Sequence, residues 1–151
     1  MNFMTLAPGH TVCVPLYSIY AWLSGDILEY MERSDNVLNT GFCSLLTFTP
    51  YDGEATLLPA RPSLIGINEK TVEYTPIFRE SNVLATNLGA KDLETHADFQ
   101  APSILVVTEG SGTIKILGDG RTLNLGAGCV FFAGPEAKLQ SATDDGRERH
   151  T

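Results

Sequence analysis

The sequence has no long apolar run and little positive charge. No stretch of its 151 residues approaches the ~20 apolar residues that a membrane-spanning helix needs, so we expect no membrane partner. Ten Lys and Arg residues against 18 Asp and Glu residues give a net charge of −8, which argues against a nucleic-acid partner. The opening MNFMTLAPGH lacks the basic start and apolar core of a secretory signal, which predicts a cytoplasmic location.

Cysteine and histidine are also scarce. The chain has only three cysteines, Cys13, Cys43 and Cys129. Their odd number suits a reducing compartment, and we predict that they pack as small buried side chains. The three histidines form no HxH or HxxxH pair and are predicted to lie in loops or turns: His10, His96 and His150. These residues predict neither a metal site nor another cofactor.

Short β-strand patterns account for most of what the sequence does contain. Runs rich in β-branched and aromatic residues, bounded by Gly, Pro or Asp, predict strands at residues 11–14, 20–23, 26–31, 103–108, 112–117 and 128–133. The glycines in EGSGT (109–113) and LGDGR (117–121) indicate tight hairpin connections. Residues 26–38 also fit a helix, so that a helix and a strand followed by a loop both stay open there.

An internal similarity indicates how these strands are arranged. LAPGHTVCVPLYSIY (6–20) aligns with LGAGCVFFAGPEAKL (125–139), each copy being a turn glycine, a buried strand and a second turn. Repeated units of this kind point to an all-β fold, a single antiparallel β-barrel or jelly roll with few helical turns. We expect one domain over residues 1–140 and a polar tail over residues 141–151.

Two motifs resemble a known family. The spacing Gly9-x5-Pro15-x-Tyr17-x2-Tyr20 resembles the cupin motif G-x5-P-x-G-x2-H. YAWLSGDILEYMERSDNV (20–37) resembles the segment HAYLSGDILECMARSDNV of the type I phosphomannose isomerases, which belong to the cupin superfamily. Together with CSLLTFTPYDGEATLLP, YTPIFRESNVL and APSILVVTEGSGTIKILGDGRTLNLGAGCVFFAG, the resemblance covers residues 2–140 and implies the C-terminal cupin of that family.

The resemblance also implies what has changed at the site. Members of the family are zinc-dependent enzymes that interconvert mannose 6-phosphate and fructose 6-phosphate. Their Gln-x-His pair and glutamate ligand come from the N-terminal half, which the match does not include, and the histidine expected here is Tyr20. A phenol is a poor zinc ligand beside an imidazole. The expected arginine is Asn39, whereas Glu29 and Asp35 match active-site carboxylates. The chain alone is therefore not expected to isomerise mannose 6-phosphate.

Glu29 and Tyr20 are the candidate catalytic residues. Tyr20 is either a general acid and hydrogen-bond donor or an aromatic side chain that fills the former metal site. Strand alternation places Glu29 on one face with Ile27 and Met31, as a barrel-lining proton-transfer group or an ordinary exposed residue. The candidate substrate-binding residues are Tyr17, Trp22, Asp35 and Asn39, although Ser-Asp-Asn is also strong turn chemistry for Asp35.

Two functions fit the sequence. The first is a metal-free, phosphomannose-isomerase-like cupin that binds a small organic molecule in its barrel and, if catalytic, isomerises or cyclises it by acid–base and shape effects. The second is a truncated, non-catalytic remnant of a zinc-dependent mannose-6-phosphate isomerase. Exposed sheet edges would favour a homodimer in either case.

Overall fold

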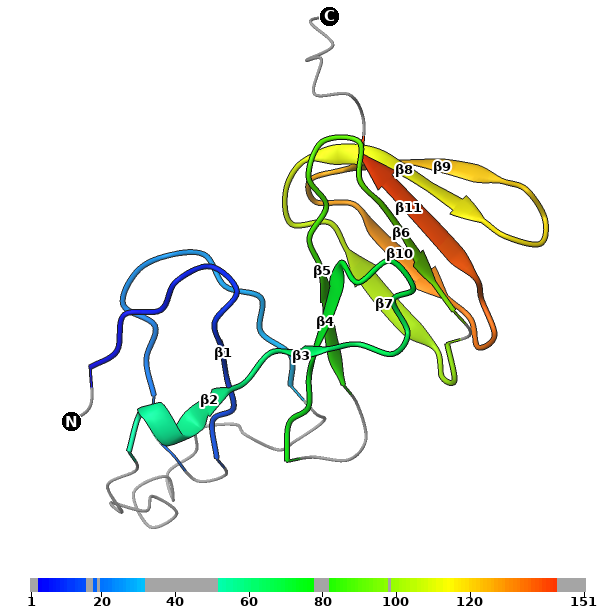
Figure 1. Cartoon of the computed structure of the whole chain (residues 1–151). Helices are drawn as coiled ribbons and strands as arrows, with labels where there is room; N and C mark the ends of the chain where they lie inside the picture. The colour runs from blue at the N-terminus through cyan, green and yellow to red at the C-terminus, as the bar shows by residue number, and fades with distance from the viewer. Residues whose placement is uncertain are drawn as a thin grey trace, which may run out of the picture. The chain divides into compact units, whose positions relative to one another are not determined.

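The computed structural model describes residues 3–15, 18, 20–31, 52–77, 82–97 and 99–143, and the regular secondary structure of these residues is almost entirely β (Figure 1). The chain divides into two compact units, residues 1–58 and residues 59–151. All strand pairs between the described residues are antiparallel, which confirms the all-β prediction.

Within its described residues, the first unit contains one short sheet. Strand β1 (Thr11–Val12) pairs with β2 (Leu57–Leu58), and a single 3-10 turn, η1 (Glu54–Thr56), leads into β2. A backbone hydrogen bond of 2.9 Å from the Cys13 N–H to the Thr56 carbonyl extends this pairing. Two strands bury little surface, which explains why this unit has no fully buried residue among those described.

The second unit holds the other nine described strands in three sheets. The first sheet has the order β3-β4-β5, the second β6-β11-β8-β9, and the third pairs β10 with β7. Their bounds are β3 Arg61–Pro62, β4 Thr71–Tyr74, β5 Val83–Thr86, β6 Leu93–His96, β7 Ser103–Val106, β8 Ser111–Ile116, β9 Thr122–Gly126, β10 Val130–Ala133 and β11 Leu139–Thr143. Among these strands the hydrogen bonds form separate sheets and not one closed ring, an arrangement consistent with a cupin-like β fold.

The core of the second unit lies between these sheets. Its buried apolar residues come from β8, β10, β11 and the segment before β7: Ile114, Ala133, Leu139 and Phe99. Half-buried side chains pack against them, among them Leu105 of β7 and Leu125 of β9. A fully buried Ile, Leu or Phe side chain stabilises a fold by about 1.5–3 kcal/mol, so Ile114, Leu139 and Phe99 contribute most to holding the sheets together.

Four of the six predicted strands are confirmed, at residues 11–14, 103–108, 112–117 and 128–133, as β1, β7, β8 and β10. The β8–β9 hairpin over residues 117–121 is also confirmed, with Gly118 and Gly120 in the positive-φ backbone that favours glycine. Gly110 likewise has a φ of 80°, but the turn at residues 109–113 joins β7 and β8, which lie in different sheets. The prediction of a hairpin there was wrong.

The strands predicted at residues 20–23 and 26–31 were also wrong. The chain has no regular secondary structure over either stretch, and its side chains are exposed. Alternation of side chains yields a strand only where a neighbouring strand supplies hydrogen bonds, and neither stretch pairs with any described strand. The helix considered for residues 26–38 does not form over residues 26–31, and residues 32–38 lie outside the described part.

Two further expectations concern the polar tail and the burial of the cysteines. β11 runs to Thr143, so the first residues of the predicted polar tail belong to the sheet, while the single domain over residues 1–140 stays a prediction. Cys13 and Cys129 are free and half-buried, not fully buried as predicted, and Cys43 lies outside the described residues. No helix among the described residues is long and apolar enough to cross a membrane.

Candidate functional site

The two candidate catalytic residues contact each other directly. The Tyr20 hydroxyl donates a hydrogen bond of 2.6 Å to Oε1 of Glu29, nine residues further along the chain. The bend that allows this centres on Ser24 and Gly25, where Gly25 has a φ of 104°. That backbone conformation suits glycine because a side chain would be strained there. The sequence between Tyr20 and Glu29 therefore brings the two groups together without any sheet.

The contacts within this pair favour the protonated form of the Tyr20 phenol. The hydrogen bond to Glu29, partial burial and the negative charge of Glu29 all raise the pKa of Tyr20 above its ordinary value. Near neutral pH Tyr20 is therefore a neutral hydrogen-bond donor, and Glu29 is its acceptor. Trp22 packs edge-on against the Tyr20 ring, with the ring centres 6.0 Å apart at an angle of 73°.

The environment of the pair differs from the one that strand alternation predicts. Glu29 is exposed, and so are Ile27 and Leu28, which alternation would place on opposite faces. Tyr20 is 47% exposed and Trp22 43% exposed. The remaining candidate substrate-binding residues lie outside the described residues: Tyr17, Asp35 and Asn39. Of the predicted site, the structure thus brings together Tyr20, Glu29 and Trp22.

The residues at this pair do not fit zinc. A zinc ligand must give up its proton, and the raised pKa of Tyr20 makes that harder than for an ordinary tyrosine. The Glu29 carboxylate already accepts a hydrogen bond from the Tyr20 hydroxyl. Across the described residues no group of three or more His, Cys, Asp or Glu side chains could hold a metal ion.

A second cluster of polar side chains, in the second unit, was missed by the sequence reasoning. Glu94 of β6 is fully buried, and its carboxylate accepts four hydrogen bonds. The Asn68 N–H and the Thr95 N–H donate to Oε1 at 2.7 and 3.0 Å, and the Lys70 N–H and the Thr71 hydroxyl donate to Oε2 at 2.7 and 3.1 Å. This carboxylate fastens the loop at residues 66–70 to β6.

His96 extends the same cluster. Its Nε2 lies 3.1 Å from the hydroxyls of both Thr71 and Thr86, and its ring stacks on Phe99 at 6.0 Å. The prediction that His96 lies in a loop or turn was wrong, because it is a buried residue of β6. The alternation in LETH, with Glu94 and His96 two residues apart, was the available signal.

The pKa shifts in this cluster favour an ionised Glu94 and a neutral His96. Burial raises the pKa of the Glu94 carboxyl, but the hydrogen bonds that it accepts lower this pKa by a larger amount. The net pKa is therefore below the ordinary value. Burial lowers the pKa of His96, and the Glu94 charge opposes this only in part. The cluster therefore holds an ionised carboxylate beside a neutral imidazole, which suits a structural role.

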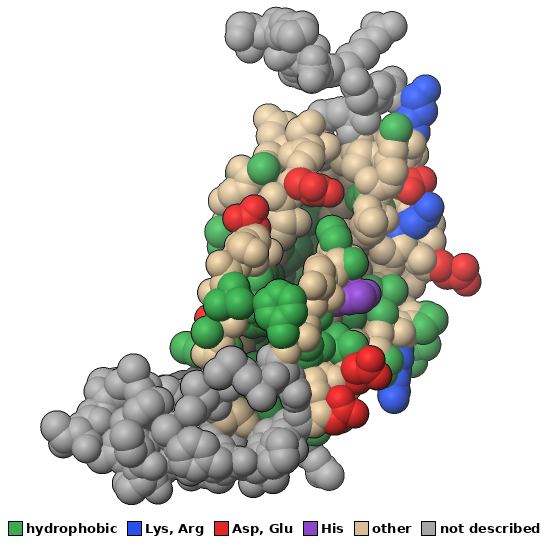
Figure 2. Space-filling model, turned by 90° about the vertical axis from the view of Figure 1, so that its left-hand side faces the viewer, with side chains coloured by type: hydrophobic (Ala, Val, Ile, Leu, Met, Phe, Trp, Pro, Cys, Tyr) green, Lys and Arg blue, Asp and Glu red, His purple; other side chains and the backbone are tan. Residues whose placement is uncertain are grey.

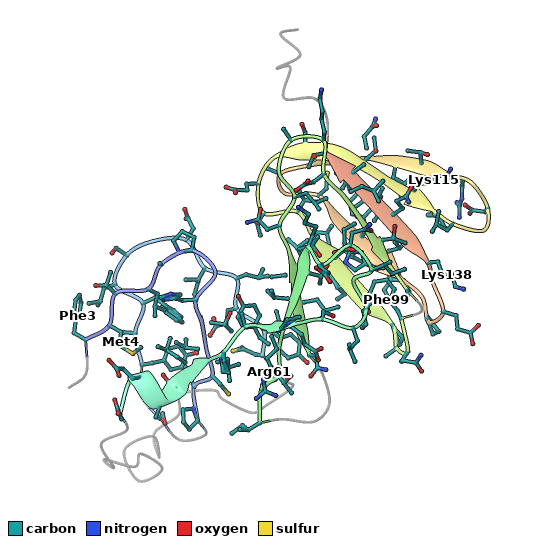
Figure 3. The ribbon with its side chains drawn as sticks, viewed as in Figure 1. Phe3, Met4, Arg61, Phe99, Lys115 and Lys138 are labelled. Carbon is teal, nitrogen blue, oxygen red and sulfur yellow. The ribbon has the colours of Figure 1, made fainter. Side chains whose placement is uncertain are left out.

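A half-open depression of about 440 Å³ also lies in the second unit. Its lining residues come from the segments just before β7 and just after β10: Phe99, Gln100, Pro135, Glu136 and Lys138. Figure 3 shows Phe99 and Lys138 among them. Neither Tyr20 nor Glu29 lines this depression, so it is separate from the predicted site.

Comparison with known proteins supports the resemblance seen in the sequence. No family model matches the chain. The mannose-6-phosphate isomerases of Eremothecium gossypii, Saccharomyces cerevisiae and Ogataea parapolymorpha are 35%, 33% and 32% identical to it. These matches cover 95–96% of this chain but only 36% of each relative. Over nearly its whole length, the chain therefore resembles a C-terminal part of the mannose-6-phosphate isomerases.

Proposed function

We propose that the chain is a metal-independent, phosphomannose-isomerase-like protein that binds a small organic molecule at Tyr20, Glu29 and Trp22. The observation that carries this proposal is the 2.6 Å hydrogen bond between the Tyr20 hydroxyl and the Glu29 carboxylate. It joins a neutral donor and a charged acceptor at the position where the resemblance implies a zinc-binding histidine.

The pair offers a ligand three kinds of contact. On binding, the single O–H of Tyr20 would turn from Glu29 to donate a hydrogen bond to a carbonyl or hydroxyl oxygen of the ligand, and Glu29 would accept one from a ligand hydroxyl in its place. Trp22 supplies an exposed aromatic surface beside them, which favours a flat or apolar ligand. A phosphate group would lie near the negative charge of Glu29, so a neutral ligand is favoured over a sugar phosphate.

Catalysis by the same pair would be proton transfer next to a carbonyl group. Glu29 would remove a proton from the carbon that bears the hydroxyl group and return it to the former carbonyl carbon, and the hydroxyl proton would pass to the former carbonyl oxygen within the cis-enediolate. Tyr20, with its O–H turned from Glu29 to the ligand, would donate a hydrogen bond to that oxygen. A general base of this kind contributes typically 10²–10⁴-fold in rate. The net result is the isomerisation of an α-hydroxy ketone to an α-hydroxy aldehyde, with no proton gained or lost.

Trp22 makes binding directly observable, because it is the only tryptophan in the chain. The full chain is titrated with 2-hydroxyacetophenone, a flat α-hydroxy ketone, and with mannose 6-phosphate, while the Trp22 fluorescence is recorded. Free N-acetyltryptophanamide controls for collisional quenching. We expect a saturable change with 2-hydroxyacetophenone and a weaker one with mannose 6-phosphate.

Matched variants locate the site. Tyr20→Phe and Glu29→Gln each remove one partner of the hydrogen bond, and each is expected to weaken binding on the order of tenfold. Tyr30→Phe and Glu54→Gln make the same chemical changes at other exposed positions of the first unit and are expected to bind as the wild type does. A linear response to 2-hydroxyacetophenone, or full binding by Tyr20→Phe, would refute the proposal.

A second candidate function follows from the length of the match. The chain spans 36% of the relatives, so it also fits a non-catalytic part of a mannose-6-phosphate isomerase. The exposure of Glu29 favours this alternative, since an active-site carboxylate is usually shielded from water. Absence of saturable binding with both ligands, in a chain that is folded by circular dichroism, would favour it over the first candidate.

A further inference from the structure

Strands β7 and β10 carry an apolar face that nothing described covers. Val130 pairs with Val106 and Phe132 pairs with Ile104, so the four side chains point to the same side of this two-stranded sheet. They are 63%, 41%, 74% and 73% exposed. Hydrophobic side chains are also visible at the surface of the space-filling view in Figure 2. These four residues are called the β7–β10 face below.

The opposite side of the same strands is also apolar. Ala133 of β10 belongs to the buried core, and Leu105 of β7 packs against that core. Strands that are apolar on both sides are normally covered on both sides, whereas a sheet with one wet side alternates apolar and polar residues. Serine, threonine or lysine would therefore be expected at the four outward positions if they faced only water.

The dimensions of the β7–β10 face match one short helix. Two strands of four residues are about 13 Å long and, with their side chains, about 10 Å wide. An α-helix with its side chains is about 10–12 Å wide and rises 1.5 Å per residue, so about nine residues of helix cover the face. Helix on sheet is also one of the standard ways in which a sheet buries its apolar side.

The size of the face argues against a second copy as the occupant. Four side chains of this kind offer on the order of 300–500 Å² of apolar surface. A stable dimer needs about 800 Å² from each partner. The face alone is therefore too small for a stable dimer, and its area fits the smaller contact of a single short helix that binds weakly and reversibly.

The charge of the chain indicates what should flank the apolar stripe of that helix. Glu109 follows β7 at the Val106 end of the face, and Glu136 follows β10 at the other end, both exposed. Lys138 comes two residues after Glu136 and balances it in part. The net charge of −8 leaves the surroundings acidic, so lysine and arginine are the complementary flanking residues.

We propose that the β7–β10 face docks an amphipathic helix of a partner protein, with apolar residues on one side and basic residues at its flanks. The site is independent of Tyr20 and Glu29, which lie in the other unit. Phe132 and Ile104 are the expected anchors, because they are large, adjacent and among the most exposed residues of the face.

Three labelled peptides test the shape and charge of the occupant. Each has 14 residues and is titrated with the full chain while its fluorescence anisotropy is recorded. The first has Leu and Lys at helical spacing, the second has the same composition with Leu and Lys alternating, and the third replaces every Lys of the first by Glu. We expect the first to bind at least about tenfold more tightly than either of the others.

Paired variants test the location. Phe132→Ser should weaken binding of the first peptide on the order of tenfold, and Val130→Thr, which keeps the β-branched shape, should weaken it less. Ile77→Ser is the matched control, because Ile77 is also 74% exposed but lies outside the face. Circular dichroism confirms that each variant is folded.

Three results would overturn the proposal. Equal binding by the Phe132→Ser and Ile77→Ser variants would place the peptide elsewhere. Tighter binding of the alternating peptide would indicate that a strand adds to a sheet edge instead. Self-association of the chain in sedimentation experiments, lost in Phe132→Ser, would make the face an interface between copies of the chain.

Discussion

At the scale of single residues, one substitution decides the chemistry of the site. The resemblance implies a histidine at position 20, and its imidazole could bind a metal. Tyr20 instead donates a hydrogen bond to the Glu29 carboxylate. The pair is self-sufficient, because each group satisfies the other without a metal. Both side chains are also exposed, which leaves them accessible to a ligand.

The state of Tyr20 yields a prediction for Glu29. The hydrogen bond to the Glu29 carboxylate is the main reason that the pKa of Tyr20 is raised. In Glu29→Gln the acceptor is neutral, so the pKa of Tyr20 should fall toward the ordinary value of about 10. The measurement is the chemical shift of the tyrosine Cζ carbon as a function of pH, in protein labelled at that position. Glu54→Gln is the control, and an unchanged Tyr20 pKa in Glu29→Gln would contradict the role given to this hydrogen bond.

At the scale of elements, the loop at residues 66–70 and strand β6 are built around each other. Gly66 forms an isolated bridge with His96, and the Ile67 N–H donates to the Thr95 carbonyl at 2.9 Å. These contacts hold the loop close to β6, so that its backbone N–H groups reach the Glu94 carboxylate. The loop thereby satisfies a buried charge that would otherwise be strongly unfavourable.

The close approach at Gly66 predicts a specific effect of alanine. A Cβ at this position would lie 2.7 Å from the Thr71 Cβ and 2.9 Å from Glu94 Oε2, and both side chains are buried. We expect Gly66→Ala to lower the free energy of unfolding of the second unit by about 1–3 kcal/mol. Gly126→Ala meets nothing within 4 Å and should change it by less than about 1 kcal/mol. Equal effects in urea denaturation would contradict the packing described at Gly66.

The buried carboxylate itself predicts a larger effect. In Glu94→Gln the side chain keeps one acceptor and gains an amide group that faces backbone donors, so at least one N–H loses its partner. We expect a loss of about 2–4 kcal/mol in the free energy of unfolding of the second unit. Glu109→Gln, at an exposed position, is the control and should stay within about 0.5 kcal/mol. A stable Glu94→Gln variant would show that the hydrogen bonds contribute little.

At the scale of the whole molecule, the second unit should be sensitive to acid. The folded-state pKa of His96 is lowered, so the unfolded chain takes up a proton first as the pH falls below about 6.5, and stability declines from there toward the folded pKa. The pKa of Glu94 is lowered too, so its contribution is present above the ordinary Glu range and is lost as the pH falls through its folded pKa. Both groups act in the same direction.

Urea denaturation between pH 8 and pH 2.5 tests this, with the NMR signals of Ile114 reporting on the second unit. The denaturation midpoint should fall in two stages, the first due to His96 and the second to Glu94. His96→Gln should remove the first stage, and Glu94→Gln the second. A midpoint that is constant over this range, or a first stage that persists in His96→Gln, would contradict the assignment.

The whole chain is also expected to lack mannose-6-phosphate isomerase activity. The chain spans only 36% of the length of its relatives. The resemblance implies that the isomerase activity depends on zinc, and the Tyr20–Glu29 pair does not fit zinc. A coupled assay with zinc-supplemented protein should show no turnover above background, while the Saccharomyces cerevisiae enzyme serves as the positive control. Measurable turnover that is abolished by a chelator would show that a metal site exists in this chain.

Much of the fold followed from local patterns, and part of the site did too. Runs of β-branched and aromatic residues identified β7, β8 and β10, and glycines located the turn after β8, because these features depend on neighbours in sequence. The Tyr20–Glu29 pair was within reach of the same reasoning, since only nine residues and one bend separate the two groups. Strands at residues 20–23 and 26–31 were predicted from local composition, and neither forms because no described strand pairs with either stretch.

The sequence by itself determined the all-β class, the acidic composition and the resemblance to the isomerases, which implies a histidine where Tyr20 stands. Only the tertiary structure decided that Glu94 and His96 are buried together, since their partners Asn68, Lys70 and Thr71 come from more than 20 residues away. It also decided which side of β7 and β10 is open. Both sides of these strands are apolar in sequence, and only the packing of one side against the core leaves the other exposed.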